Sequence, residues 1–283
     1  MSRVMLLTVF AGLVLALPTF GQANDAARFR WQKGQVLTYK VEQSTTVNEV
    51  AKNADTNAEE RSLIVTKLRL IKRWQVSDVD ANGIATLTMT ITALRMETKR
   101  GEEMPEVFDS AKPDPDHPET QAEMVKYINQ PLTTVRIDSV GKLIEVKESK
   151  FGSATRLEAD LPFKLILPNT TLTANQAWER AYTITLDRTG DKYEATQKYT
   201  CKGFNAGIAV IGVSTVVKEQ PSVVGEQIPL LPFQPEGDLY FHTTTGRYIG
   251  ARLKIQKELV NHQGEGSKYS FTSSYAEDAV DGQ

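Results

Sequence analysis

Along most of the chain, hydrophobic and polar residues alternate with a period of two. Between Thr86 and Ala93, every second residue is apolar and the residues between them are threonines. Successive side chains of a strand lie on opposite faces, so this alternation predicts strands with one buried face. Gln35 to Asn48 alternates in the same way. Another long strand is predicted before a turn at 80–83, with the apolar residues Ile64, Leu68, Leu70, Trp74 and Val76.

Breaks in the alternation predict where the strands bend and turn. After Ala93 the apolar positions move by one residue to Leu94 and Met96, which predicts a bulge or bend. Asn82-Gly83 between two alternating runs is typical of a hairpin. Further turns are predicted at 139–142, 189–191 and 245–247.

Helix signals are few. A helix is predicted from Pro118 to about Asn129, and a second short helix near Ser149 to Ala159. The polar segment Val50 to Arg61 and the proline-containing segment Gly101 to His117 are predicted to be loops. Proline clusters at 161–168 and 229–235 predict edges or crossings between layers, because proline lacks the N–H that a central strand donates.

These patterns predict a mainly β protein: a large curved antiparallel sheet or partial barrel with one or two short helices. Three matches occur in the same order in both halves. Trp31 with 37–41 matches Trp178 with 181–184, 82–85 matches 206–209, and 139–144 matches 244–249. They predict two duplicated meanders, at 28–150 and 175–278, within a single domain over 24–283. The alternative is that antiparallel sheets reuse similar turns without any duplication.

Composition and the first residues predict an exported protein. The 283 residues are 40% hydrophobic and 24% charged, as in globular proteins, and the net charge of −2 argues against a nucleic-acid binder. Residues 1–23 are interpreted as a signal peptide, with Arg3, an apolar run from Val4 to Leu17, and a small-residue cleavage site at Ala23. After cleavage we expect a periplasmic or extracellular protein that does not span the membrane. An uncleaved anchor is the alternative.

The titratable residues do not form a recognisable catalytic or metal-binding pattern. The only cysteine, Cys201, is interpreted as a buried core residue, and no cysteine near residue 23 supports a lipid anchor. The histidines at 117, 242 and 262 lack the spacing of a zinc site. The acidic segment 109–119 is interpreted as a solvated loop, with a calcium site as the alternative. The SxxK pattern at 139–142 and the glycine-rich 264–268 are interpreted as hairpin turns. No catalytic residue, metal ligand or cofactor is predicted.

Several segments resemble a family of exported bacterial proteins of unknown function. They are Phe29 to Gln35, Trp74-Gln75-Val76 with the following Asn82-Gly83 turn, Phe108-Asp109-Ser110, and the turns at 235–237 and 245–247. The predicted architecture is also similar to the periplasmic lipoprotein-carrier fold, whose half-barrel holds acyl chains. That second resemblance implies a hypothesis about ligand class and assigns no residues.

Two functions remain open at this point, both non-enzymatic. The first is binding of a lipid-like or other apolar molecule on the concave face, because a curved sheet with few helices needs something to fill that face. The second is an envelope structural or protein-interaction module that acts through sheet edges and the predicted loops. A hydrolase is a third, weaker alternative. The candidate ligand-lining residues, for which ordinary core packing is the alternative, are Trp31, Trp74, Trp178, Phe163, Phe233 and Phe241.

Overall fold

A computed structural model describes residues 26–52, 56, 58–112, 118–150, 157 and 164–280. The predicted signal peptide lies outside the described residues, as does most of the helix predicted at 149–159, of which Leu157 is described as helical and buried. The described elements, in chain order, are β1 (Val36–Lys52), β2 (Glu59–Val79), β3 (Ala85–Arg100), β4 (Glu106–Asp109), α1 (Pro118–Val125), β5 (Pro131–Ile137), β6 (Leu143–Ser149), β7 (Ala177–Thr185), β8 (Lys192–Asn205), β9 (Ile208–Val217), the 3₁₀ helix η1 (Val224–Phe233), β10 (Glu236–His242), β11 (Arg247–Val260) and β12 (Lys268–Ala279).

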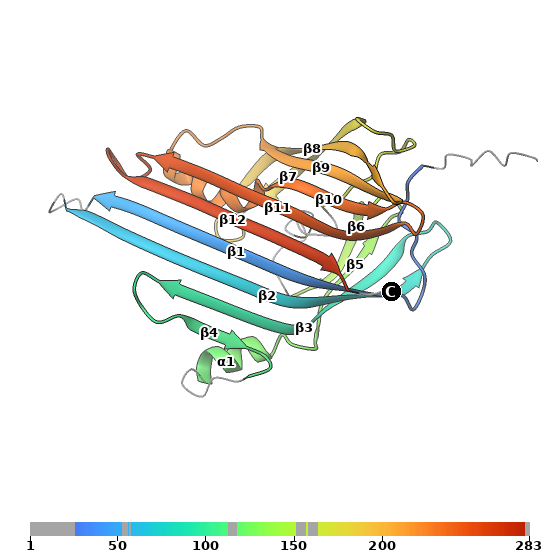
Figure 1. Cartoon of the computed structure of the whole chain (residues 1–283), viewed down its shortest axis with the longest axis horizontal. Helices are drawn as coiled ribbons and strands as arrows, with labels where there is room; N and C mark the ends of the chain where they lie inside the picture. The colour runs from blue at the N-terminus through green and yellow to red at the C-terminus, as the bar shows by residue number, and fades with distance from the viewer. Residues whose placement is uncertain are drawn as a thin grey trace, which may run out of the picture.

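The strands of the described residues form one antiparallel sheet of 12 strands, which confirms the predicted mainly β class. Its order is β6-β5-β3-β2-β1-β12-β11-β10-β9-β8-β7, and β4 pairs with β3 beside this path. The sheet does not close, because β6 and β7 end the path. The first and last strands of the chain pair at its centre, where Tyr39 lies opposite Ala279. Figure 1 shows the long central strands in front and the short strands β5 and β6 behind them.

The buried core lies on one face of this sheet, which we call the inner face. Inner-face residues from both halves belong to one hydrophobic cluster, and residues from irregular segments pack into the same cluster. The sheet therefore curls around its core, and its inner face is the concave one. Members of this cluster include Leu37, Trp74, Val76, Leu87 and Ile137 from the first half, Tyr199, Ile211, Phe241 and Tyr248 from the second, and Phe29, Leu165 and Leu167 from irregular segments.

The predicted bend after the threonine run is a β-bulge. The pairing of β2 with β3 runs from Ile71 opposite Ala93 to Lys72 opposite Ile91, which leaves Thr92 as the extra residue. A bulge reverses the faces of the residues beyond it. Ala93 therefore points to the outer face, and its predicted place on the buried face with Leu87 was wrong.

Two of the hairpin turns have the same construction. Asp80 accepts hydrogen bonds from the backbone N–H groups of Asn82 and Ile84 at 2.9 and 3.0 Å. Asp138 accepts equivalent bonds from Val140 and Lys142 at 3.0 and 2.8 Å. A glycine with positive φ completes each turn, at positions 83 and 141. The pKa of Asp80 is lowered, and the largest cause is the hydrogen bond that its carboxylate accepts from the Ile84 N–H.

The predicted loops are partly strands. The segment Val50 to Arg61 was predicted to be a loop, but β1 continues to Lys52 and β2 begins at Glu59. β-Pairing across the sheet thus overrides the polar character of these residues. Within the predicted loop 101–117, residues 106–109 form β4, and its Phe108 is buried.

The helical and proline-rich segments are close to expectation. α1 begins at Pro118 as predicted but ends at Val125; Asn129 has a φ of 58° and donates its N–H to the Ile91 carbonyl. The 229–235 cluster lies largely in η1, which contains two prolines. Residues 164–168 cross inside the sheet, where Leu165 and Leu167 are buried. In the described part of the chain, no helix combines the length and apolar character needed to cross a membrane.

The three sequence matches between the halves fall at comparable places. The turn at 82–83 joins β2 to β3, and its match at 206–207 joins β8 to β9. The matched turns near 141 and 246 join β5 to β6 and β10 to β11. Trp31 precedes β1 and Trp178 lies in β7. This placement is the one a duplication of two meanders would produce, and the duplication itself stays a prediction.

Candidate functional site

The inner face is covered unevenly along the long central strands. Near one end its residues are buried, as at Tyr39, Val41 and Trp74. Farther along the same strands lies a contiguous set of half-buried inner-face side chains, which we call the inner strip. Its members are Gln43, Thr45 and Val47 of β1, Ile64, Thr66, Leu68 and Leu70 of β2, Met96 of β3 and Tyr275 of β12.

Buried residues border the inner strip on two sides. On the β11 side Ile255 and Phe271 pack with Leu231 of η1 in a separate small cluster, against which Val47 also packs. Toward the core, the strip is bordered by Val41 and Glu277, which lie opposite each other, and by Lys72, which lies opposite Tyr39 and two residues beyond the β2 partner of Val41. The strip is therefore a partly covered apolar surface with a charged boundary at its core end.

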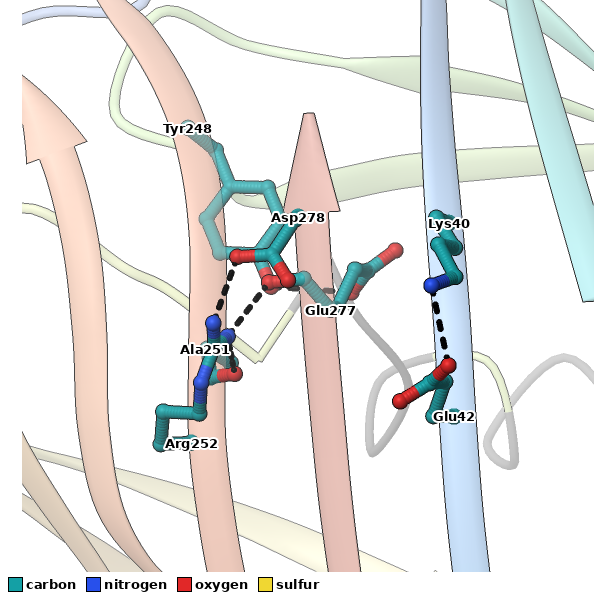
Figure 2. Close-up of polar contacts among 7 residues, drawn as sticks. All are labelled: Lys40, Glu42, Tyr248, Ala251, Arg252, Glu277 and Asp278. Carbon is teal, nitrogen blue, oxygen red and sulfur yellow. Dashed lines mark hydrogen bonds and ion pairs between the residues drawn. The ribbon is translucent and has the colours of Figure 1, made fainter. Parts of the chain in front are cut away.

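That boundary contains a buried ion pair. Lys72 Nζ lies 2.6 Å from Glu277 Oε1, and the two side chains are 10% and 0% exposed. The other carboxylate oxygen of Glu277 accepts hydrogen bonds from the hydroxyls of Tyr248 at 2.8 Å and Tyr275 at 3.0 Å. Figure 2 shows Tyr248 of β11 beside the Glu277 carboxylate of β12. A buried charge needs both a counter-charge and hydrogen bonds, and Glu277 has both.

Tyr248 remains a neutral donor in this cluster. Burial, assisted by the nearby Glu277 carboxylate, raises the pKa of Tyr248 well above its usual value. The third tyrosine, Tyr39, donates its hydroxyl to the backbone carbonyl of Tyr248 at 3.0 Å, and Lys72 Nζ lies 5.8 Å from the centre of its ring. These groups hold the Glu277 carboxylate in one position at the end of the inner strip.

Small polar side chains continue from the ion pair into the strip. Thr45 and Ser273 share a hydroxyl hydrogen bond of 2.9 Å across β1 and β12. The Gln43 amide donates to both hydroxyls at 3.4 Å. The strip therefore has a polar side along β1 and β12 and an apolar side along β2 and β3. Such a surface can accept a molecule with an apolar body and a few polar atoms.

The predicted lining aromatics do not lie in this strip. Trp74 and Phe241 are 1% and 0% exposed, and both belong to the main core. Trp31 stacks on Phe29, which also packs edge-on against Phe241. Trp178 stacks on Tyr199 and donates its N–H to the Ile166 carbonyl at 2.7 Å.

The two remaining candidates lie elsewhere. Phe233 is half-buried and packs against a second cluster formed around Ile184 and Leu230. Phe163 lies outside the described residues. The structure thus places Trp74 and Phe241 in the main core, and the half-buried Trp31 and Trp178 against it.

The other residues singled out by chemistry are also accounted for. Cys201 is buried, as predicted, and burial raises the pKa of its thiol. Asp109 pairs with Arg95 at 3.0 Å, whereas 113–117 lie outside the described residues. His262 Nε2 lies 2.7 Å from Glu49 Oε1, and His242 Nδ1 accepts the N–H of Thr245. Within the described ranges, no three His, Cys, Asp or Glu side chains gather as metal ligands would.

Sequence reasoning missed the ion pair, although a signal was present. Lys72 lies between Leu70 and Trp74 in the alternation, and so on the predicted buried face. Glu277 holds the corresponding position after Tyr275 in β12. A lysine and a glutamate on the buried faces of two strands are expected to form an ion pair, because an isolated buried charge is costly.

Comparisons with known proteins add little to this geometry. No protein-family model and no curated protein matches the chain. One solved structure that aligns with it is DynF, from the dynemicin biosynthesis pathway of Micromonospora chersina. That alignment has 7% sequence identity, covers 95% of this chain and 92% of the other, and has a TM-score of 0.20. A likeness of this size supports no argument about fold or function.

Proposed function

We propose that this chain is a non-enzymatic exported module that binds a lipid-like or other apolar molecule on its concave face. The observation that carries this proposal is the inner strip, where Val47, Ile64, Leu68, Leu70 and Met96 are only half-buried beside a fully buried core. Burial of apolar surface stabilises a complex by roughly 25 cal/mol per Å², so covering these side chains favours an apolar guest.

The charged end of the strip refines the ligand class. The hydroxyl of Tyr275 and the amide of Gln43 stand where the apolar floor meets the Lys72–Glu277 pair. A guest with one polar end could bond there while its apolar part lies along β2 and β3. An amphipathic molecule, such as one with an acyl chain, therefore fits the strip better than a pure hydrocarbon.

A neutral fluorescent probe tests the proposal. N-phenyl-1-naphthylamine should bind the purified chain with increased fluorescence, and a fatty acid should displace it. Leu68→Glu places a charge in the inner strip and should weaken probe binding by roughly tenfold or more. Val65→Glu is the matched control, because Val65 is half-buried on the outer face of the same strand. Circular dichroism and urea unfolding establish that both variants are folded.

Two results would overturn this function. One is a wild-type protein that binds neither the probe nor the fatty acid. The other is an equal loss of binding in Leu68→Glu and Val65→Glu, which would place the probe elsewhere. Native mass spectrometry of protein extracted from its own envelope adds a direct readout, since a bound guest appears as additional mass.

A second candidate function is an interaction module that uses the open sheet edges. The sheet path ends at β6 on one side and β7 on the other, and Ile144 of β6 is 44% exposed. Unpaired strand edges can add a strand from a partner protein. Crosslinking in the native envelope should then link β6 or β7 to another protein, and the Leu68→Glu variant should be crosslinked as well as the wild type.

A further inference from the structure

The outer face of the central strands has a shallow hollow of about 550 Å³. By strand register, its small and charged side chains lie on the face opposite the inner strip, and the inner-strip residues Gln43, Leu68 and Tyr275 also line it. Its floor includes three small side chains, Ser44 of β1 and Ser274 and Ala276 of β12. Long charged side chains surround that floor: Lys67, Arg69, Arg95, Arg252, Glu42 and Glu97. We call this surface the outer hollow.

Strand register explains its shape. Arg95, Arg69, Glu42, Ala276 and Arg252 lie directly opposite one another on β3, β2, β1, β12 and β11, so they form one row across the sheet. Arg69 and Arg252 are three strand spacings apart, about 14 Å between their backbones. An extended arginine side chain covers about half of that span, so both arginines can reach one ligand held above Ala276.

The charge of the outer hollow is opposite to that of the whole chain. Its lining has four cationic side chains and two carboxylates, whereas the chain has a net charge of −2. Each carboxylate is shared between two cations. Glu42 lies 2.9 Å from Lys40 and 3.9 Å from Arg69, and Glu97 lies 3.8 Å from both Lys67 and Arg95.

The cations are also accessible. Arg69 is 69% exposed and its contact with Glu42 is long, so its guanidinium is available to a ligand. Arg252 pairs with Asp278 at 2.7 Å and remains 49% exposed. In Figure 2, Arg252 of β11 pairs with Asp278 of β12, and Lys40 pairs with Glu42 on β1, the strand on the other side of β12.

We propose that the outer hollow binds an acidic oligosaccharide through its carboxylate groups. Arginine holds carboxylates with two parallel hydrogen bonds, and here arginines rise on both sides of the floor. The hydroxyls of Ser44 and Ser274 can bond to sugar hydroxyls. The floor continues along β1 and β12 with Thr46, Asn48, Thr272 and Ser270 on the same face, so the hollow is open to an extended chain.

An acidic peptide fits this surface less well than a carbohydrate does. Peptides commonly bind β-proteins by adding a strand to a sheet edge. The floor strands β1 and β12 are central and have paired neighbours on both sides. A carbohydrate needs no backbone partner and can use side-chain hydroxyls and guanidinium groups alone.

Fluorescence anisotropy with a labelled oligogalacturonate tests this site. Wild-type protein should bind it, and the affinity should fall with added salt because the arginines are exposed. The double variant Arg69→Gln/Arg252→Gln should weaken binding by roughly tenfold or more. Arg69→Lys/Arg252→Lys keeps the charge but loses the two-pronged geometry, and should have an intermediate affinity.

The control keeps the net charge change and moves it away from the hollow. Arg188→Gln/Lys198→Gln alters exposed residues at the β7–β8 turn and on β8, and should bind like the wild type. Equal weakening in both Gln double variants, or no binding by wild-type protein at low salt, would overturn the proposal. Tighter binding of a labelled oligoglutamate than of the oligogalacturonate would also overturn it.

This inference and the proposed function can fail separately. The outer hollow and the inner strip lie on opposite faces of the same strands. The Arg69→Gln/Arg252→Gln protein should therefore bind N-phenyl-1-naphthylamine like the wild type. Ile64→Glu, at an inner-strip position that does not line the hollow, should weaken probe binding and leave oligogalacturonate binding unchanged.

Discussion

Replacing Lys72 by methionine would remove the cation from the buried pair and keep a side chain of similar length. The Glu277 side chain is 0% exposed, and its remaining partners in the described structure are the Tyr248 and Tyr275 hydroxyls. Hydroxyl groups stabilise a carboxylate but do not neutralise it. Breaking a buried ion pair from one side typically costs 3–5 kcal/mol, so we expect Lys72→Met to lower the free energy of unfolding by about 4 kcal/mol.

That cost is a large part of the 5–15 kcal/mol that stabilises a typical domain. Urea unfolding followed by tryptophan fluorescence would measure it, and the midpoint of thermal unfolding should fall by roughly 10 °C. The double variant Lys72→Met/Glu277→Gln removes both charges and should recover more than half of the loss.

A double-mutant cycle provides the test of this reasoning. If the losses in Lys72→Met and Glu277→Gln simply add in the double variant, the two side chains do not interact energetically. A loss below about 1 kcal/mol in Lys72→Met would likewise refute the view that Glu277 depends on this lysine.

Three further predictions concern the core and its turns. Burial raises the pKa of Tyr199 from 10.0 to about 12. A group whose pKa is raised in the folded state contributes its full stability below the pKa of the unfolded state, and it loses that contribution as the pH rises through the pKa of the folded state. The free energy of unfolding should therefore fall by up to about 3 kcal/mol between pH 10 and 12, and by less in Tyr199→Phe. Gly141→Ala should lower the free energy of unfolding, measured in urea, by roughly 1–3 kcal/mol, because φ is 93° and a Cβ would lie 2.4 Å from the Leu165 carbonyl oxygen. Gly190→Ala should lower it by less, because a Cβ at that position meets no neighbouring atom. Cys201 should react with Ellman's reagent slowly in the folded protein and quickly in urea, and equal rates would contradict its burial.

Strand alternation and turn residues made most of the sheet predictable. Each strand predicted from the period of two is present, and the parity change near Leu94 located the bulge at Thr92. The sequence did not predict that β1 and β2 extend into both ends of 50–61 and cover half of it, because that pairing depends on neighbouring strands rather than on local composition. β4 was missed for the same reason, as its four residues gain their structure from β3.

The candidate site was less predictable than the fold. The large aromatic residues were predicted to line a ligand site because of their large apolar area, yet Trp74 and Phe241 pack into the core. Apart from Tyr275, the inner strip instead consists of aliphatic and polar residues such as Leu68 and Thr45, which look ordinary in the sequence. Which part of a strand is left half-covered depends on where η1 and segment 164–168 pack, and that is a long-range property.

The central β1–β12 seam bears on how a newly made chain reaches this fold. Tyr39 of β1 pairs with Ala279 of β12, so the middle of the sheet can form only after the whole segment between these two strands has been synthesised. Contacts between such distant partners form slowly. Until they form, β1 and β11 each keep one unpaired border, which favours sticking to other chains. A holding chaperone that shields these two strands during synthesis would therefore raise the yield of folded protein more than one that shields β6 or β7.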